Sequence, residues 1–146
     1  MSVTFVIGHS CAGYSSYIKK YFSNSVVVDL YNFQDKLITV QSVLDAYDKC
    51  KAALIEALKH NDDVVLEHTL SKRIRREDYI NAVRTVTDTP IECIVIMPEK
   101  DVIVANAEKR GIKLRGDMID DYIEFFEVPS VEEGFEKVTF ISSFDL

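Results

Sequence analysis

The chain has 146 residues, of which 47% are hydrophobic and 28% are charged, a balance typical of one domain around one buried core. The formal net charge of −7 argues against a broad surface that coats nucleic acid, although basic clusters over 72–76 and 109–115 leave room for a local basic cleft. No apolar run approaches the roughly 20 residues that a membrane-spanning helix needs, so we expect a single domain over residues 1–146 and no membrane partner.

Short apolar strands alternate with amphipathic helices along the chain. In chain order, the apolar spacing predicts a strand over 3–7, a helix over 15–22, a strand over 26–30, a helix over 40–59, a strand over 64–66, a helix over 75–86, a strand over 91–97, helices over 101–110 and 117–126, and a strand over 138–141. Strands that are apolar throughout and alternate with helices indicate a parallel sheet covered on both faces. We therefore predict a three-layer α/β/α fold with a mostly parallel five-stranded sheet, whose ligands would bind at the carboxyl ends of the strands.

The segment after the first predicted strand reads Gly-His-Ser-Cys-Ala-Gly-Tyr-Ser-Ser. A phosphate-binding loop has the pattern Gly, four residues, Gly, Lys, then Ser or Thr, between a strand and a helix. Gly8 and Gly13 have this separation, and Ser15 stands where the magnesium-binding hydroxyl belongs. Such glycines let successive amides and a helix N-terminus face an anion. The pattern predicts a phosphate site made by Gly8, His9, Ser10, Cys11, Ala12, Gly13, Tyr14, Ser15 and Ser16. The alternative is a strand-to-helix turn that binds nothing.

The lysine of this pattern is missing, and Tyr14 occupies its position. Lysine brings a positive charge to the β- and γ-phosphates, which a tyrosine cannot do at neutral pH. The backbone cradle can survive the change, but much of the stabilisation of the transition state would be lost. The loop is therefore a degenerate version of the motif.

Other segments resemble, in order and spacing, the polynucleotide-kinase-like branch of P-loop kinases over almost the whole chain. These segments are Leu66-Glu67-His68-Thr69, Ile74-Arg75-Arg76, Met97-Pro98-Glu99, the lid-like run from Ala105 to Gly111, and Glu133-Gly134-Phe135-Glu136-Lys137-Val138. The resemblance implies a P-loop NTPase-like fold with ATP and Mg²⁺ as cofactors. It also implies transfer of the γ-phosphoryl group to a hydroxyl of a nucleic-acid end, a nucleotide or a small metabolite.

The resemblance also assigns roles to residues outside the loop. Asp29, near the end of the second strand, would accept the proton of the attacking hydroxyl, and Arg110 in the lid helix would stabilise the transferred charge. Independently of the resemblance, the position of His68 at the end of a strand predicts a ligand contact or an acid–base group, and the alternative is a histidine with only a local hydrogen bond. Substrate contacts would come from Glu67, Thr69, Arg75 and Arg76, the two arginines being alternatively part of a solvated surface.

Three departures from the family pattern concern residues that carry catalysis. Tyr14 replaces the loop lysine, His68 stands where an aspartate is expected, and Ala105 replaces the first lid arginine. Losses of this kind each reduce the rate by on the order of a hundredfold or more, although such effects are not additive. A catalytically inactive pseudokinase that senses nucleotide or binds a protein partner is therefore the alternative to an active kinase. A third possibility is that a different anion or nucleotide occupies the cleft, with the Tyr14 ring stacked on it.

The cysteines and the first residues bear on the location of the protein. Cys11, Cys50 and Cys93 are far apart, odd in number, and match no metal-binding spacing. The first residues lack a basic leader and a cleavage pattern, so we expect no signal peptide. A reducing, cytoplasmic setting fits these features best.

Overall fold

The computed structural model describes residues 1–9, 11–34, 39–113 and 116–142. Its helices and strands follow the predicted order: β1 (Ser2–Gly8), α1 (Tyr14–Tyr21), β2 (Val26–Asp29), the 3₁₀ helix η1 (Leu30–Phe33), α2 (Val40–His60), β3 (Asp63–His68), α3 (Arg73–Arg84), β4 (Ile91–Ile96), α4 (Lys100–Lys109), α5 (Gly116–Phe125), the 3₁₀ helix η2 (Val131–Glu133) and β5 (Lys137–Ile141). Within the described residues, no helix is long and apolar enough to cross a membrane.

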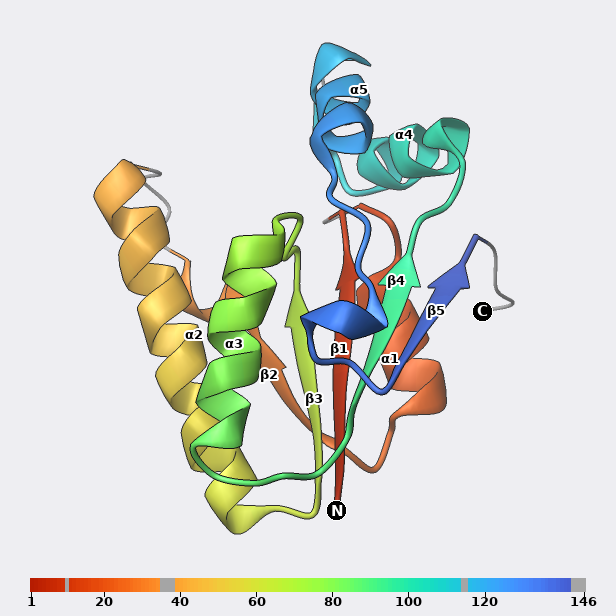
Figure 1. Cartoon of the computed structure of the whole chain (residues 1–146). Helices are drawn as coiled ribbons and strands as arrows, with labels where there is room; N and C mark the ends of the chain where they lie inside the picture. The colour runs from red at the N-terminus through yellow and green to blue at the C-terminus, as the bar shows by residue number, and fades with distance from the viewer. Residues whose placement is uncertain (10, 35–38, 114–115, 143–146) are drawn as a thin grey trace.

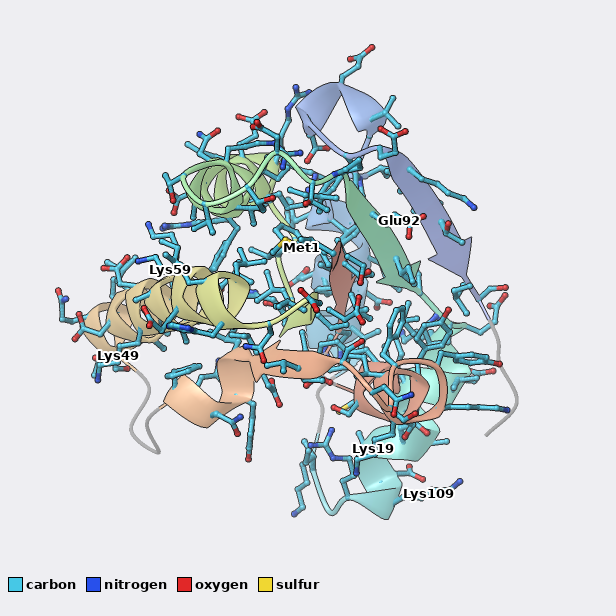
Figure 2. All side chains as sticks on the ribbon, turned by 90° about the horizontal axis from the view of Figure 1, so that it is seen from below. Met1, Lys19, Lys49, Lys59, Glu92 and Lys109 are labelled. Carbon is cyan, nitrogen blue, oxygen red and sulfur yellow. The ribbon has the colours of Figure 1, made fainter. Side chains whose placement is uncertain are left out.

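The five strands form one sheet in the order β2-β3-β1-β4-β5, and every described pair is parallel (Figure 1). All strands therefore end at the same edge, which is the upper edge in Figure 1. The helices α2 and α3 cover one face of the sheet and α1 covers the other, which the view from below shows most clearly (Figure 2). The predicted α/β/α architecture and the five-stranded parallel sheet are confirmed.

The alternation of side chains along each strand divides the core into two parts. In β1, Phe5 and Ile7 are buried under α2 and α3, whereas Val6 packs with Ile18 of α1. In β3, Leu66 belongs to the first of these cores. Successive side chains of a strand point to opposite faces, so the next residue, Glu67, turns toward α1. This period of two decides which polar groups meet at the carboxyl edge.

The helices α4 and α5 lie beyond this edge and not on either face of the sheet (Figure 1). We call residues 100–125 the lid. The end of the lid and the segment after it contact the start of α3, because the Lys72 ammonium donates to the Phe125 carbonyl over 2.7 Å and the Arg73 amide donates to the Glu127 carboxylate over 3.0 Å. Gly111 ends the first lid helix with a positive φ of 69°, as its position in the sequence predicts.

Candidate functional site

Three oxygen-bearing side chains predicted from the sequence meet at the carboxyl edge. Asp29 and Glu67 are register partners at the ends of β2 and β3, and their side chains share a hydrogen bond. The Ser15 hydroxyl, from the first turn of α1, donates to the Glu67 carboxylate over 2.5 Å. We call Asp29 and Glu67 the acidic pair. The pair lies on the α1 face because both residues follow an apolar residue that faces α2 and α3.

Glu67 is only 3% exposed, and its side chain is hydrogen-bonded to that of Asp29. Burial and the hydrogen bond to Asp29 raise the pKa of Glu67 to about 7, while the hydrogen bond from Ser15 opposes that rise. In its protonated form, Glu67 donates a hydrogen bond to Asp29, which is why this contact raises the pKa of Glu67. Two carboxylates and a hydroxyl are the hard oxygen ligands that Mg²⁺ prefers, so this part of the site fits that ion.

Replacing Glu67 with glutamine is expected to remove a pH dependence of stability. Because the pKa of Glu67 is raised on folding, the folded state holds its proton more tightly than the unfolded state. Its contribution to stability is complete below the ordinary value of 4.5 and is lost as the pH rises through about 7. Urea unfolding should show that the Glu67→Gln variant gains stability relative to the unmodified protein between pH 5 and pH 8.

The matched control for this comparison is Glu136→Gln, since Glu136 is an exposed carboxylate outside the site. Its stability relative to the unmodified protein should stay constant over the same pH range. A constant difference for the Glu67→Gln variant as well would show that Glu67 does not titrate between these values.

We call residues 8–16 the phosphate loop after their predicted role, and the two glycines of this loop have the geometry that the motif requires. Gly13 adopts φ 93° directly before α1, a left-handed conformation that favours glycine. A Cβ on Gly8 would lie 2.7 Å from the Ile96 carbonyl oxygen, so β1 and β4 can only approach this closely with glycine there. The first amides of an α-helix have no partner within the helix, and α1 begins at the carboxyl edge, shortly after β1 ends. Ser10 lies outside the described residues.

His9 closes part of the loop on itself. The Cys11 amide donates to His9 Nδ1 over 3.1 Å, and the Ala12 amide donates to the His9 carbonyl over 2.9 Å. Burial lowers the pKa of His9, which keeps Nδ1 without a proton and able to accept this bond. Two loop amides are therefore already engaged, so an anion at this loop would be bound by the amides at the start of α1.

Tyr14 is buried at the position of the absent lysine. Its ring packs with Val6, Ala12 and Ile96 on the α1 face of the sheet, and the residue is 9% exposed. Burial, followed by the nearby carboxylates of Glu67 and Asp29, raises the pKa of Tyr14 well above its usual range. The phenol thus remains a neutral hydroxyl beside the acidic pair.

The lid contacts the phosphate loop through Cys11. The Asn106 side-chain amide donates to the Cys11 carbonyl over 2.8 Å, and Arg110 Nη1 lies 4.0 Å from the Cys11 sulfur. The Arg110 charge also acts on the Tyr14 phenol, so it lies near the predicted site. Asn106 was part of the lid-like run in the sequence, but no signal there assigned it a contact with the loop.

The structure places His68 and Arg76 in the core and not at the acidic pair. His68 is fully buried on the α2/α3 face, where Nδ1 accepts from the Leu70 amide over 3.1 Å and Nε2 lies 3.2 Å from the Tyr79 hydroxyl. Burial lowers the pKa of His68 to about 3, so the ring stays neutral. These contacts fit the alternative prediction for His68, a histidine at the end of a strand with a local hydrogen bond, better than they fit a catalytic role.

Arg76 is fully buried as well, in an ion pair with Glu133. Arg76 Nε and Nη2 donate to the two Glu133 oxygens over 2.6 and 3.2 Å, and Nη1 donates to the Leu70 carbonyl over 2.9 Å. Leu70 has a positive φ of 25°, so the arginine and His68 together hold a strained turn after β3. This geometry leaves Arg76 no side-chain surface for a substrate, contrary to its predicted role.

The remaining predicted substrate residues are Arg75, on α3, and Thr69, in the turn after β3. Arg75 is exposed, and its guanidinium lies 5.6 Å from the centre of the Tyr47 ring, while Thr69 is half-buried in the turn after β3.

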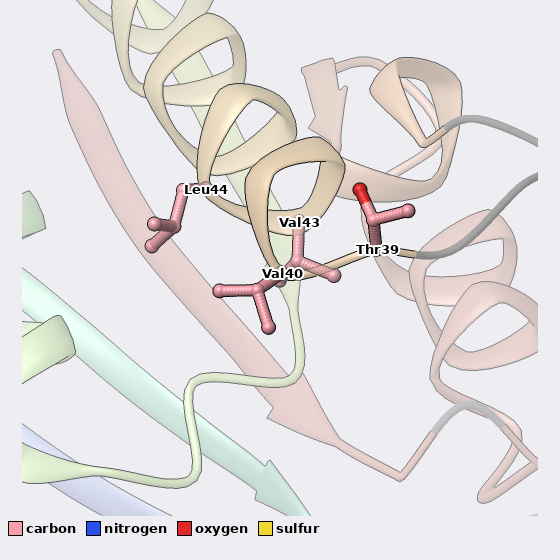
Figure 3. A pocket seen from close by; sticks show the side chains of 4 residues that line it. All are labelled: Thr39, Val40, Val43 and Leu44. Atoms are coloured by element: carbon pink, nitrogen blue, oxygen red, sulfur yellow. The ribbon is translucent and has the colours of Figure 1, made fainter.

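A shallow hollow of about 370 Å³ opens at the start of α2 (Figure 3). It is lined by Thr39, Val40, Val43 and Leu44. Three aliphatic chains and one hydroxyl provide nothing that would hold a metal or a phosphate group.

Comparisons of structures give the same fold. The chain is similar to a sugar kinase from Janibacter sp. HTCC2649, with a TM-score of 0.67 and 10% identity over 97% of this chain and 85% of that one. It is similar to a gluconokinase from Sinorhizobium meliloti 1021, with a TM-score of 0.64 and 15% identity over 97% and 82% of the two chains.

A third similar structure is a chain of the Pnkp1/Rnl/Hen1 RNA repair complex, with a TM-score of 0.71 and 17% identity. The similarity covers 86% of this chain but only 43% of that longer chain. No protein-family model matches the sequence, and no curated protein matches it in sequence. The architecture, the position of the loop and these neighbours agree that the chain has a fold of the P-loop kinase type.

Proposed function

We propose that this protein binds a nucleoside triphosphate with Mg²⁺ at the carboxyl edge of its sheet and is a kinase-like phosphotransferase acting on a hydroxyl group. The observation that carries the proposal is the meeting of Ser15, Glu67 and Asp29 beside the start of α1. Ser15 and Glu67 would hold the ion, and the amides at the start of α1 would bind phosphate oxygens. When bound, Mg²⁺ neutralises charge on the phosphates.

Asp29 and Arg110 would carry out the remaining steps of the transfer. Asp29, whose side chain is hydrogen-bonded to Glu67, would accept the proton of an attacking hydroxyl. Arg110 would stabilise charge on the transferred group from the lid. The acceptor would be a nucleic-acid end, a nucleotide or a small metabolite, and the similarity to a chain of an RNA repair complex favours the first of these.

A second candidate is a nucleotide-sensing pseudokinase without phosphotransfer. It is favoured by the buried Tyr14 at the lysine position and by the engagement of the Cys11 amide with His9. Both features reduce the electrostatic stabilisation available to a transferred phosphoryl group but leave the amides at the start of α1 in place. The two candidates share nucleotide binding and differ in turnover.

Isothermal titration calorimetry with ATP, with and without Mg²⁺, tests the shared part. We expect binding that requires Mg²⁺, and a loss of about tenfold in affinity in the Ser15→Ala variant, because a ligand of the ion is removed. Ser23→Ala, an exposed serine in the turn after α1, is the control and should bind normally. The absence of heat at millimolar ATP would contradict the proposal.

Transfer of labelled γ-phosphate separates the two candidates. Acceptors would be an oligonucleotide with a 5′-hydroxyl, a nucleoside and a sugar. Transfer that disappears in Asp29→Asn would support the phosphotransferase, whereas ATP binding without transfer to any acceptor would favour the pseudokinase.

A further inference from the structure

Tyr122 projects from the second lid helix toward the phosphate loop. Its ring centre lies 5.0 Å from that of His9, with the two rings nearly perpendicular at 84°. On its other side it lies 5.6 Å from the ring of Phe126. These two contacts hold the Tyr122 ring against His9, the loop residue that accepts hydrogen bonds from the Cys11 and Ala12 amides.

The hydroxyl of Tyr122 is buried, yet no described residue forms a hydrogen bond with it. Buried polar groups almost always have a partner, since leaving one unsatisfied destabilises the fold. Phenylalanine would keep both ring contacts without this cost. No contact among the described residues therefore explains why this position has a hydroxyl group.

The Tyr122 phenol is within electrostatic reach of Tyr14 at the proposed nucleotide site and of Arg76 in the core. Tyr14 in turn lies near the charges of Glu67, Asp29 and Arg110. Burial raises the pKa of Tyr122 well above its usual range, as it does for Tyr14. Both phenols thus keep their protons at neutral pH and can donate hydrogen bonds.

We propose that Tyr122 is a phosphate-binding residue, whose hydroxyl donates to a phosphate oxygen of the nucleotide beside Tyr14, where the loop has no lysine. The inference rests on the proposed function and extends it to a residue of the lid. The occupant is the polyphosphate part of the ligand, because this neighbourhood combines hydroxyl donors, the Arg110 guanidinium and the amides at the start of α1. A neutral donor of this kind supplies a directed hydrogen bond where lysine would supply a charge.

The variant Tyr122→Phe tests this role, because it removes one oxygen and keeps the ring. Calorimetric titration with ATP and Mg²⁺, and separately with inorganic tripolyphosphate, should show affinities about five- to tenfold weaker than those of the unmodified protein. Unfolding by urea without ligand should show equal or greater stability, since an unsatisfied hydroxyl is lost. Tyr21→Phe, at the far end of α1 and 52% exposed, is the control and should change neither quantity.

The outcomes separate this inference from the proposed function. If the unmodified protein binds neither ligand, the proposed function fails and the inference fails with it. If it binds both and Tyr122→Phe binds equally well, only the inference is overturned. A variant that loses stability without ligand would show that the hydroxyl has a structural partner, which also overturns the inference.

Discussion

Replacing Arg76 with methionine is expected to lower the free energy of unfolding by about 3–5 kcal/mol, the usual cost of breaking a buried ion pair by removing one partner. The substitution leaves the Glu133 carboxylate, which is 1% exposed, without its guanidinium. It also removes the donor to the Leu70 carbonyl, which helps hold the strained turn after β3. Urea unfolding at neutral pH measures the loss.

Two further variants identify the cause of this loss. Arg73→Met removes an arginine from the same helix whose ion pair with Glu77 is half-exposed, and it should cost less than about 1 kcal/mol. The double variant Arg76→Met, Glu133→Leu should recover much of the stability, because an apolar pair can replace a buried ion pair at little cost. If Arg76→Met were as stable as Arg73→Met, the buried pair would not support the fold.

The elements of the fold could be predicted because each signal is local. Apolar runs and helical spacing identify the strands and helices within a few residues of their observed bounds. The third strand was predicted too short, over 64–66, because the apolar run ends at Glu67. The observed strand continues to His68, since both residues pair with β1 and are buried despite their polarity.

The candidate site could be predicted from the sequence only for residues whose place in a motif, or near the end of a strand, determines which neighbours they have. Ser15 has a fixed place in the loop pattern, and Asp29 and Glu67 follow neighbouring strands, so a parallel sheet brings them to one edge. Arg76 has no such constraint, because its partner Glu133 lies 57 residues further along the chain. A sequence cannot distinguish an arginine that binds phosphate from one that neutralises a distant carboxylate. No sequence pattern identified Tyr122 either, because Tyr122 and its contact His9 are far apart in the chain.

The position of Tyr14 decides how far the loop has departed from an efficient kinase. A Tyr14→Lys variant replaces a buried neutral phenol with a flexible cation beside the acidic pair and the start of α1. The loop glycines and the amides at the start of α1 do not depend on this side chain. The variant should therefore bind ATP with Mg²⁺ more tightly than the unmodified protein.

The expected gain is about 10- to 100-fold in ATP affinity, the range of a hydrogen bond to a charged group, measured by calorimetric titration. Tyr17→Lys adds the same charge one turn further along α1 and should leave affinity almost unchanged, so a general electrostatic effect would appear in both variants. Lost packing against Val6 and Ile96 is expected to lower the stability of Tyr14→Lys without ligand. An unchanged affinity in a folded Tyr14→Lys variant would mean that residues 8–16 do not form a phosphate cradle. A gain in affinity without a gain in phosphate transfer would instead place the defect in the acidic pair or the lid, because the charge of the loop would then have been restored.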